Sequence, residues 1–291
     1  MSRSMVGHLA MFAFSILVAG AFALGALAAN EITPLALNVV RFWLATGLMG
    51  IVAYMTVGIT RANAHAPWRY FVLAAFFSTY FVLMFEGLKT AAPVSAAAVF
   101  TLTPILTAGF GWLLLRQKLT GRMALALLIG LLGAVWVIFR ADVSAILRFE
   151  IGTGELIYFV GCVSHAVYTP LVRKLNRGES PLVFSFGVLL AGSLILTVVG
   201  WNDVMSTDWA ALPQIVWVTI IYTALFASAA TFTLLQFAAL RLPSSKVMAY
   251  TYLTPSWVIV WDIGLGGTAP PVMILAGIVL TIIALLLLLR D

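Results

Sequence analysis

Two copies of one tripeptide place polar groups in the middle of apolar segments. Leu102-Thr103-Pro104 and Leu253-Thr254-Pro255 are 151 residues apart, and each lies midway along a strongly apolar run. A proline within a helix has no N–H, so the carbonyl four residues earlier loses its partner. Here those carbonyls belong to Phe100 and Thr251. In lipid such a carbonyl must be buried in protein or face a wet cavity, so we expect both kinks to point inward. The kinks are either static or bend during gating.

Hydroxyl groups gather around these kinks. Thr101 and Tyr252 each lie three residues before a proline, and Thr103 and Thr254 lie one residue before it. Such groups can bond a polar solute, or they can bond back to their own helix, as Ser and Thr in membranes often do. We expect Thr101, Thr103, Thr251 and Tyr252, with Phe100, to contribute to a substrate-binding site.

A third group of candidate residues is aromatic. Tyr80 and Met84 are four residues apart, and Phe81 and Phe85 follow one residue behind, so one stripe can face a cavity and the other lipid. A lining of aromatic rings and methionine is adaptable and suits a broad substrate range. Packing is the alternative. We expect Tyr80 and Met84 to line the site.

Three further polar residues lie within apolar segments. His165 is an ionisable residue in mid-segment, and Tyr168 lies one turn further along the same face. An ionisable side chain at this depth is a functional hypothesis by default. His165 could bind substrate, relay protons or bond a neighbouring hydroxyl. Gln236 is a similar buried polar group, and we place all three in the predicted binding site.

Four charged residues lie in or near the apolar segments: Arg41, Glu86, Glu155 and Asp262. All are expected within about two turns of the outer surface, where long side chains reach the interface. Arg41 and Glu86 lie at similar depth and could form a pair, either as a gate latch or as a static salt bridge.

The sequence carries no constellation for catalysis or metal binding. It contains neither an H-E-x-x-H helix nor a phosphate-binding G-x-x-x-x-G-K-[ST] loop, and no paired acids lie near the middle of a segment. A single mid-segment histidine makes a metal site unexpected. The lone Cys162 cannot form an internal disulfide. We therefore expect no metal, no cofactor and no catalytic residue.

The elements that position these residues must be membrane helices. Of the 291 residues, 63% are hydrophobic and only 9% charged, with a mean hydropathy of +1.10, whereas soluble domains average about 25% charged residues. The net charge of +6 comes from basic residues in short loops, which indicates membrane topology rather than a nucleic-acid partner. The partner implied is the lipid bilayer.

Ten apolar segments have about the length that a helix needs to cross the hydrocarbon core. The first is too long for a typical signal peptide, so we expect it to be a span. The segments are roughly 7–28, 34–57, 68–88, 93–115, 120–139, 154–174, 181–200, 213–240, 244–265 and 269–289.

The distribution of lysine and arginine predicts the orientation of these spans. With the N-terminus inside, 12 basic residues lie on the cytoplasmic side and three, Lys89, Arg140 and Arg148, lie outside. Cytoplasmic loops carry such an excess. We therefore predict that both termini are cytoplasmic.

Ten spans with a repeated tripeptide in the fourth and ninth predict an internal repeat. Five is an odd number, so the second half must enter the membrane upside-down relative to the first. We predict an all-α membrane protein of two inverted five-helix repeats, 1–148 and 149–291, around a central cavity. Such repeats are recurrent in secondary transporters, with the substrate site near the midplane.

The chain resembles the drug/metabolite transporter superfamily, in its ten-helix EamA-type branch, over essentially its whole length. The residues that carry the resemblance are Arg41-Phe42, Gly87-Leu88, Pro104, Pro255, Tyr168 with Arg173-Lys174, Gly130, Gly133 and Gly277. The resemblance implies a cavity lined mainly by helices 3, 4, 8 and 9, with contributions from helices 1, 6 and others. Arg116-Gln117 departs from the Gly-Glu pair that the family often shows after helix 4, which blurs the subfamily. Within the family it is most similar to YddG-type exporters of aromatic and other neutral amino acids.

The function expected is alternating-access export of a small organic metabolite across a bacterial inner membrane, with aromatic or neutral amino acids as leading substrates. Drugs, nucleosides or other metabolites are the alternatives within the family, and an intramembrane enzyme or a channel is the alternative outside it. No segment is long enough for a soluble ATPase domain, and we expect no ATPase subunit to be required. With no carboxylate near the midplane, we expect facilitated movement down the substrate gradient.

Overall fold

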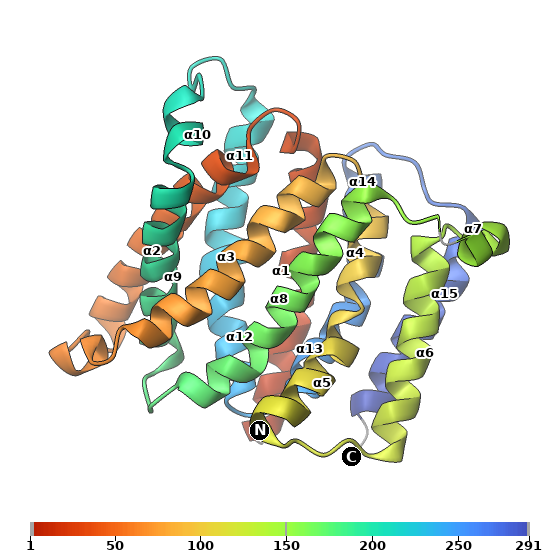
Figure 1. Ribbon diagram of the computed structural model, residues 1–291, viewed down its shortest axis with the longest axis horizontal. Coiled ribbons are helices and arrows are strands. Elements are labelled where there is room, and N and C mark those ends of the chain that lie inside the picture. Colours follow the sequence, from red (N-terminus) through yellow and green to blue (C-terminus); the bar gives the residue numbers. More distant parts are fainter. Residues whose placement is uncertain (1–2, 149, 290–291) are drawn as a thin grey trace.

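The computed structural model describes residues 3–148 and 150–289, and within them the chain forms helices joined by short connections (Figure 1). The long uninterrupted helices are α1 (Arg3–Ala28), α2 (Pro34–Thr56), α3 (Trp68–Leu88), α6 (Gly121–Ile138), α8 (Thr153–Leu175), α9 (Pro181–Val199) and α15 (Val272–Leu289). The short connecting helices are η1 (Arg61–Ala64), α7 (Val143–Arg148) and α10 (Trp201–Ser206).

Three of the predicted spans are divided within the membrane. The fourth consists of α4 (Pro93–Phe100) and α5 (Thr103–Leu115). The eighth consists of α11 (Gln214–Ala224), the π-helix η2 (Leu225–Ala230) and α12 (Thr231–Ala239). The ninth consists of α13 (Ser244–Ala249), the 3-10 turn η3 (Tyr250–Leu253) and α14 (Thr254–Gly264).

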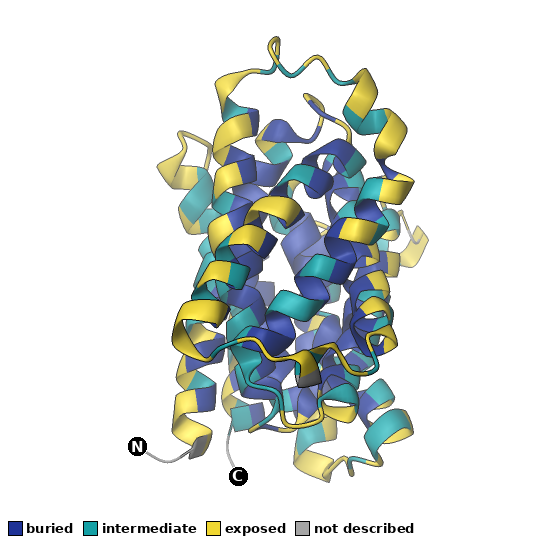
Figure 2. Cartoon of the chain, turned by 90° about the vertical axis from the view of Figure 1, so that its left-hand side faces the viewer, coloured by how far each residue is buried: buried dark blue, intermediate teal, exposed yellow. Residues whose placement is uncertain are grey.

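The lengths of these segments are those of a multi-pass membrane protein. Nine helical segments of the described chain are long and apolar enough to cross a bilayer, and the tenth predicted span is the divided segment from α13 to α14. Figure 2 shows buried residues concentrated in the interior and exposed residues on the outer surfaces of the helices. Large apolar side chains such as Trp112, Leu113 and Val198 are among those exposed, as lipid-facing surfaces require.

Local sequence signals fix where several helices begin. Thr33, Thr120 and Ser180 are N-caps whose hydroxyls accept hydrogen bonds from backbone N–H groups of the first turn. After Thr33 and Ser180, a proline occupies the first helical turn, where its missing N–H is not needed. The predicted boundaries of these spans therefore agree closely with the structure.

The two halves of the chain are inverted relative to each other. The first part of the fourth span, α4, contacts α14, the last part of the ninth, whereas α5 contacts α13. The two divided spans are therefore antiparallel. They meet at their kinks, where the hydroxyl oxygens of Thr103 and Thr251 are 3.2 Å apart. The start of α1 and the end of α15 lie on the same side of the molecule (Figure 1).

The other helices pair across the halves in the way that this inversion requires. Helix α2 packs on α9, and α6 packs on α15, so the second and fifth spans of each half meet their counterparts. Helix α3 packs on α8, and α1 packs on α12. In each half, the first span thus packs against the third span of the other half. This reciprocal exchange is a pseudo-two-fold relation.

Glycines allow the closest of these approaches. A Cβ atom at Gly133 of α6 would lie 2.6 Å from the carbonyl oxygen of Gly277 in α15, and a Cβ at Gly277 would lie 2.7 Å from that of Gly133. Small residues let membrane helices approach this closely. The backbones leave no room for a side chain at either position.

We expect Gly133→Ala to destabilise the protein by about 1–3 kcal/mol, because an added methyl group must push α6 from α15. The measurement is the apparent Tm of the detergent-solubilised protein, followed by size-exclusion chromatography after heating. The control is Gly47→Ala in α2, where a Cβ meets nothing within 4 Å. Equal Tm values for the two variants would contradict the close approach.

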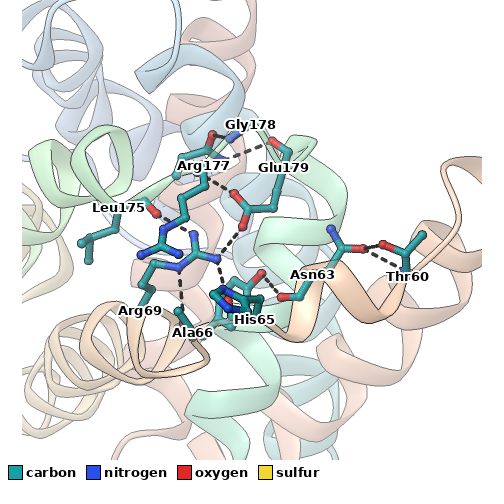
Figure 3. Close-up of polar contacts among 11 residues, drawn as sticks. Thr60, Asn63, His65, Ala66, Arg69, Leu175, Arg177, Gly178 and Glu179 are labelled. Carbon is teal, nitrogen blue, oxygen red and sulfur yellow. Dashed lines mark hydrogen bonds and ion pairs between the residues drawn. The ribbon is translucent and has the colours of Figure 1, made fainter.

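A buried arginine joins the two halves at the end of the molecule that we predict to be cytoplasmic (Figure 3). Arg69 of α3 donates to the carbonyl oxygens of Leu175, at 2.7 Å, and His65, at 3.1 Å, and forms an ion pair with Glu179 at 2.6 Å. Its side chain is 2% exposed. Although burial alone would raise the pKa of Glu179, hydrogen bonds from Arg69 and from the backbone N–H of Arg177 lower it below its ordinary value of 4.5.

Candidate functional site

The middle of the molecule is filled by rings from four helices. This aromatic cluster comprises Phe77, Tyr80 and Phe81 of α3, Phe100 of α4, Tyr158, His165 and Tyr168 of α8, and Phe232 of α12. The ring centres of Tyr80 and His165 are 4.5 Å apart, and those of Phe77 and Tyr168 are 4.6 Å apart. Each of the eight rings is at most 3% exposed. The cluster combines both halves of the chain in one buried site.

Four residues proposed for the site from the sequence belong to this cluster: Tyr80, Phe100, His165 and Tyr168. Phe77, Tyr158 and Phe232 were missed, and Phe81 was placed in the stripe beside Tyr80 but was not assigned to the site. A signal was available for two of them, since Phe77 lies one turn before Tyr80 and Phe232 lies one turn before Gln236 on their helices. Tyr158 gave no comparable signal.

Polar groups border the cluster, and two of their atoms have no hydrogen-bond partner in the described structure. The Tyr158 hydroxyl donates to that of Tyr80 at 3.1 Å, and Gln236 Nε2 donates to the Tyr168 hydroxyl at 3.3 Å. His165 Nδ1 and Gln236 Oε1 are buried without a hydrogen-bond partner in the described structure. Most buried polar atoms have a partner, and an open one calls for an explanation. The ring of His165 packs against those of Phe77, Tyr80 and Phe100, with ring centres 4.5 to 5.5 Å apart.

All four residues of the two stripes on α3 are buried, so the expectation that one stripe faces lipid is wrong. Tyr80, Phe81, Met84 and Phe85 are at most 1% exposed. The reason is that α3 is covered by α2, α8 and α9 together. A single helix sequence gives the spacing of its stripes but not the number of its neighbours.

The carbonyls before the two prolines both have partners, so the expectation that they lack them is wrong. The Thr103 hydroxyl donates to the Phe100 carbonyl at 2.6 Å, and the Thr254 N–H donates to the Thr251 carbonyl. In the first span the residue before Pro104 caps the break, and in the second the 3-10 turn η3 closes it. The divided helices therefore satisfy their own backbone.

The remaining residues near the kinks bond within their own helices or lie apart from the cluster. The hydroxyls of Thr101 and Thr251 donate to the carbonyls of Ala98 and Met248, at 2.6 and 2.8 Å. Tyr252 is 1% exposed and its ring lies against Gly130 of α6. The structure thus places the Tyr252 ring of η3 against α6 rather than among the rings of the cluster.

Arg41 of α2 is wholly buried, so the expectation that it reaches the interface is wrong. Its Nη2 and Nε donate to the hydroxyl of Ser228 in η2, at 2.8 and 3.3 Å. Its guanidinium carbon lies 3.8 Å from the ring centre of Phe81. The predicted pairing of Arg41 with Glu86 is also wrong, since Glu86 accepts from Lys89 at 2.8 Å. Sequence reasoning missed Ser228, and no sequence signal marks the π-helix that presents it.

The other two charges differ in their exposure. Glu155 of α8 is 5% exposed and accepts a hydrogen bond from the Ser95 hydroxyl at 2.7 Å, so its expected reach to the interface is wrong as well. The start of α8 packs against α4, and this covers the carboxylate. Asp262, near the end of α14, is partly exposed, as an interfacial residue should be.

A surface pocket lies between α5, α8 and α13, on the side that we predict to be cytoplasmic. This basic pocket is lined by Ala108, Gln117, Lys118, Leu119, Met123, Arg173, Pro243, Ser245 and Lys246. Three of these residues are cationic and none is acidic. It was not predicted, because its cations come from three separate loops and helix ends.

A membrane protein with two antiparallel halves of five spans, and a buried site where they meet, has the architecture of a secondary transporter. Residues 5–139 and 152–290 each match the model of the EamA-like transporter family, so the chain belongs to that family. This confirms the family that the sequence resembles. Its members are non-enzymatic transporters, which sets aside the intramembrane enzyme, and the protein acts on a small-molecule substrate in a membrane.

Two further comparisons agree with this assignment. The chain is 25% identical to a protein of Bacillus subtilis (strain 168) described as "Uncharacterized transporter YyaM", over 96% of this chain and 92% of that protein. A solved crystal structure that is 19% identical has a TM-score of 0.73 and covers 98% of this chain and 96% of its own. This second likeness shows that the fold is shared.

Proposed function

We propose that this transporter exports aromatic and other neutral amino acids, or closely related metabolites, and that the aromatic cluster is its substrate site. The observation that carries the proposal is the pair of open polar atoms, His165 Nδ1 and Gln236 Oε1, beside buried rings at the junction of the halves. A planar solute can stack on such rings. Its polar group can satisfy the two open atoms, which otherwise remain unpaired.

Transport requires the site to open alternately to the two sides. We propose that the two repeats, 1–148 and 149–291, rock against each other, with Pro104 and Pro255 at the points of bending. Phe149, at this boundary, lies outside the described residues. Thr101, Thr103, Thr251, Tyr252 and Met84 would join the site when the rings separate. Because the sequence offers no carboxylate near the midplane, the substrate gradient alone drives this movement, without an ATPase subunit.

The location that suits this activity is the bacterial inner membrane, with both termini cytoplasmic. The distribution of basic residues supports this orientation. The similarity to YddG-type exporters favours amino acids as the cargo. Nucleosides and planar drugs are the second candidate, because their rings would also stack in the aromatic cluster.

A flux screen tests the proposal. The purified protein is reconstituted into proteoliposomes, and uptake of each amino acid, of nucleosides and of cationic dyes is measured against protein-free vesicles. Saturable and competable flux of aromatic amino acids is expected. Saturable flux of nucleosides or dyes alone would replace the proposed substrate class, and non-saturable flux would indicate a channel.

We expect His165→Phe to lower the flux of the preferred substrate about fivefold at low concentration. The ring remains, but one hydrogen bond of about 1 kcal/mol is lost. Gln236→Leu should have a similar effect. The matched control is His65→Phe, in an exposed loop outside the spans. Unchanged flux in both site variants would move the substrate away from the aromatic cluster.

A further inference from the structure

Arg41 is a buried cation whose hydrogen bonds are incomplete. It is 0% exposed, and both hydrogen bonds that its guanidinium donates within the described residues go to one neutral hydroxyl, that of Ser228. Its Nη1 atom has no partner, and no carboxylate forms an ion pair with it in the described part of the chain. The guanidinium stays protonated in proteins. A full positive charge therefore lies in the protein interior without a counter-charge among the described residues.

The second buried arginine, Arg69, shows how this protein satisfies the hydrogen bonds of a guanidinium that has a structural role. Arg69 donates to three backbone carbonyls and pairs with the carboxylate of Glu179. Buried charges in proteins are ordinarily paired in this way. Arg41 is equally buried, yet it has neither an acidic partner nor hydrogen bonds to backbone carbonyls in the described structure. The difference indicates that its missing partner is not part of the protein.

Two features connect Arg41 with the substrate site. Its guanidinium lies over Phe81, whose ring centre is 4.8 Å from both Phe77 and Tyr80 of the aromatic cluster. Its hydroxyl partner, Ser228, belongs to the π-helix η2, and π-helical turns are frequent at functional sites. A solute bound to Nη1 would have its apolar part next to the cluster.

The basic pocket has a charge of the same sign as Arg41. Lys118, Arg173 and Lys246 line it without an acidic residue. A concave surface of one charge sign raises the local concentration of solutes of the opposite sign. On the side predicted to be cytoplasmic, this pocket would favour the arrival of anions rather than cations.

We propose that Arg41 binds the carboxylate of the transported solute, so that the substrates are carboxylates with an apolar or aromatic body. This inference rests on the proposed function and makes it more specific. A carboxylate accepts two parallel hydrogen bonds from a guanidinium, and Arg provides this geometry where Lys does not. The amino group of an amino acid is then dispensable, whereas its carboxylate is required.

Four probes that share a phenyl ring and differ in charge test the proposal. Flux or competition is measured in proteoliposomes with phenylalanine, 3-phenylpropionate, phenethylamine and 3-phenylpropan-1-ol. We expect the two carboxylates to be carried with saturation and the other two not to compete. Arg41→Gln should lower carboxylate flux at least tenfold, and Arg41→Lys should raise KM for the carboxylates.

The control for loss of positive charge is Arg148→Gln, in an exposed connection outside the spans, which should leave flux unchanged. Saturable flux of the amine or the alcohol, with none of the carboxylates, would overturn this inference while leaving a transporter of aromatic solutes. Equal carboxylate flux in the wild type and Arg41→Gln would also overturn it. No saturable flux of any probe would overturn the proposed function as well. If neither Arg41 variant folds, the relative flux of the four probes through the wild-type protein tests the inference.

Discussion

Arg69→Ala is expected to remove most of the folded protein from the membrane. The substitution removes the cation that pairs with the Glu179 carboxylate, whose side chain is 7% exposed in the intact pair. It also removes the donor to the carbonyls of Leu175 and His65. Removing one partner of a buried pair costs about 3–5 kcal/mol. This is a large fraction of the stability of a typical domain. The measurement is the yield of monodisperse protein, together with its apparent Tm in detergent.

The control is Arg61→Ala, an exposed arginine close to Arg69 in the chain, which should change neither yield nor Tm. The pH dependence gives a second check with a definite sign. Since folding lowers the pKa of Glu179 below 4.5, the stability from this carboxylate is fully present above pH 4.5. It is lost as the pH falls through the lowered value. A Tm difference between wild type and Arg69→Ala that stays constant below pH 4.5 would argue against the ion pair.

Locking the two kinks together is expected to reduce transport to the background level. The hydroxyls of Thr103 and Thr251 are 3.2 Å apart, on divided spans from opposite halves. Oxidation of T103C/T251C, in a C162A background that removes the single native cysteine, should therefore join the halves at their centre. If the site opens by separation of these halves, the cross-link prevents it. Flux in proteoliposomes is measured before oxidation, after it, and after addition of a reductant.

The controls are the single variants T103C and T251C, oxidised in the same way, and each should have the same flux before and after oxidation. Reductant should restore the flux of the double variant. Loss of free thiols shows that the cross-link has formed. Full flux in the cross-linked protein would mean that the kinks are static and that opening takes place elsewhere.

The spans and their inversion could be predicted because the length of each apolar run and the repeated Leu-Thr-Pro can be recognised in short stretches of the sequence. Each apolar run must be about 20 residues long, and the structure agrees within a few residues at most boundaries. The tripeptide marked the fourth and ninth spans as equivalent, and the odd number of spans in each half predicted that they are antiparallel, which their contacts confirm.

The errors concern the neighbours of a residue rather than its depth. The position of Arg41 in the sequence gives its distance from the span end, but only the packing of α2 against α3, α9 and η2 shows that the side chain is enclosed. The same holds for Phe85 and Glu155. The partners of the Phe100 and Thr251 carbonyls depend on how the backbone departs from an α-helix at the kinks. Apolar periodicity does not contain that information.

The exchange of helices between the halves has a consequence for how the protein is made. Helix α3 packs on α8 and α1 packs on α12. The first helices to be synthesised therefore lack their packing partners until the second half of the chain has been made. Insertion of the first five spans therefore yields an intermediate with unfilled lateral surfaces. The packing of α6 is completed only when α15 has been synthesised and reaches it.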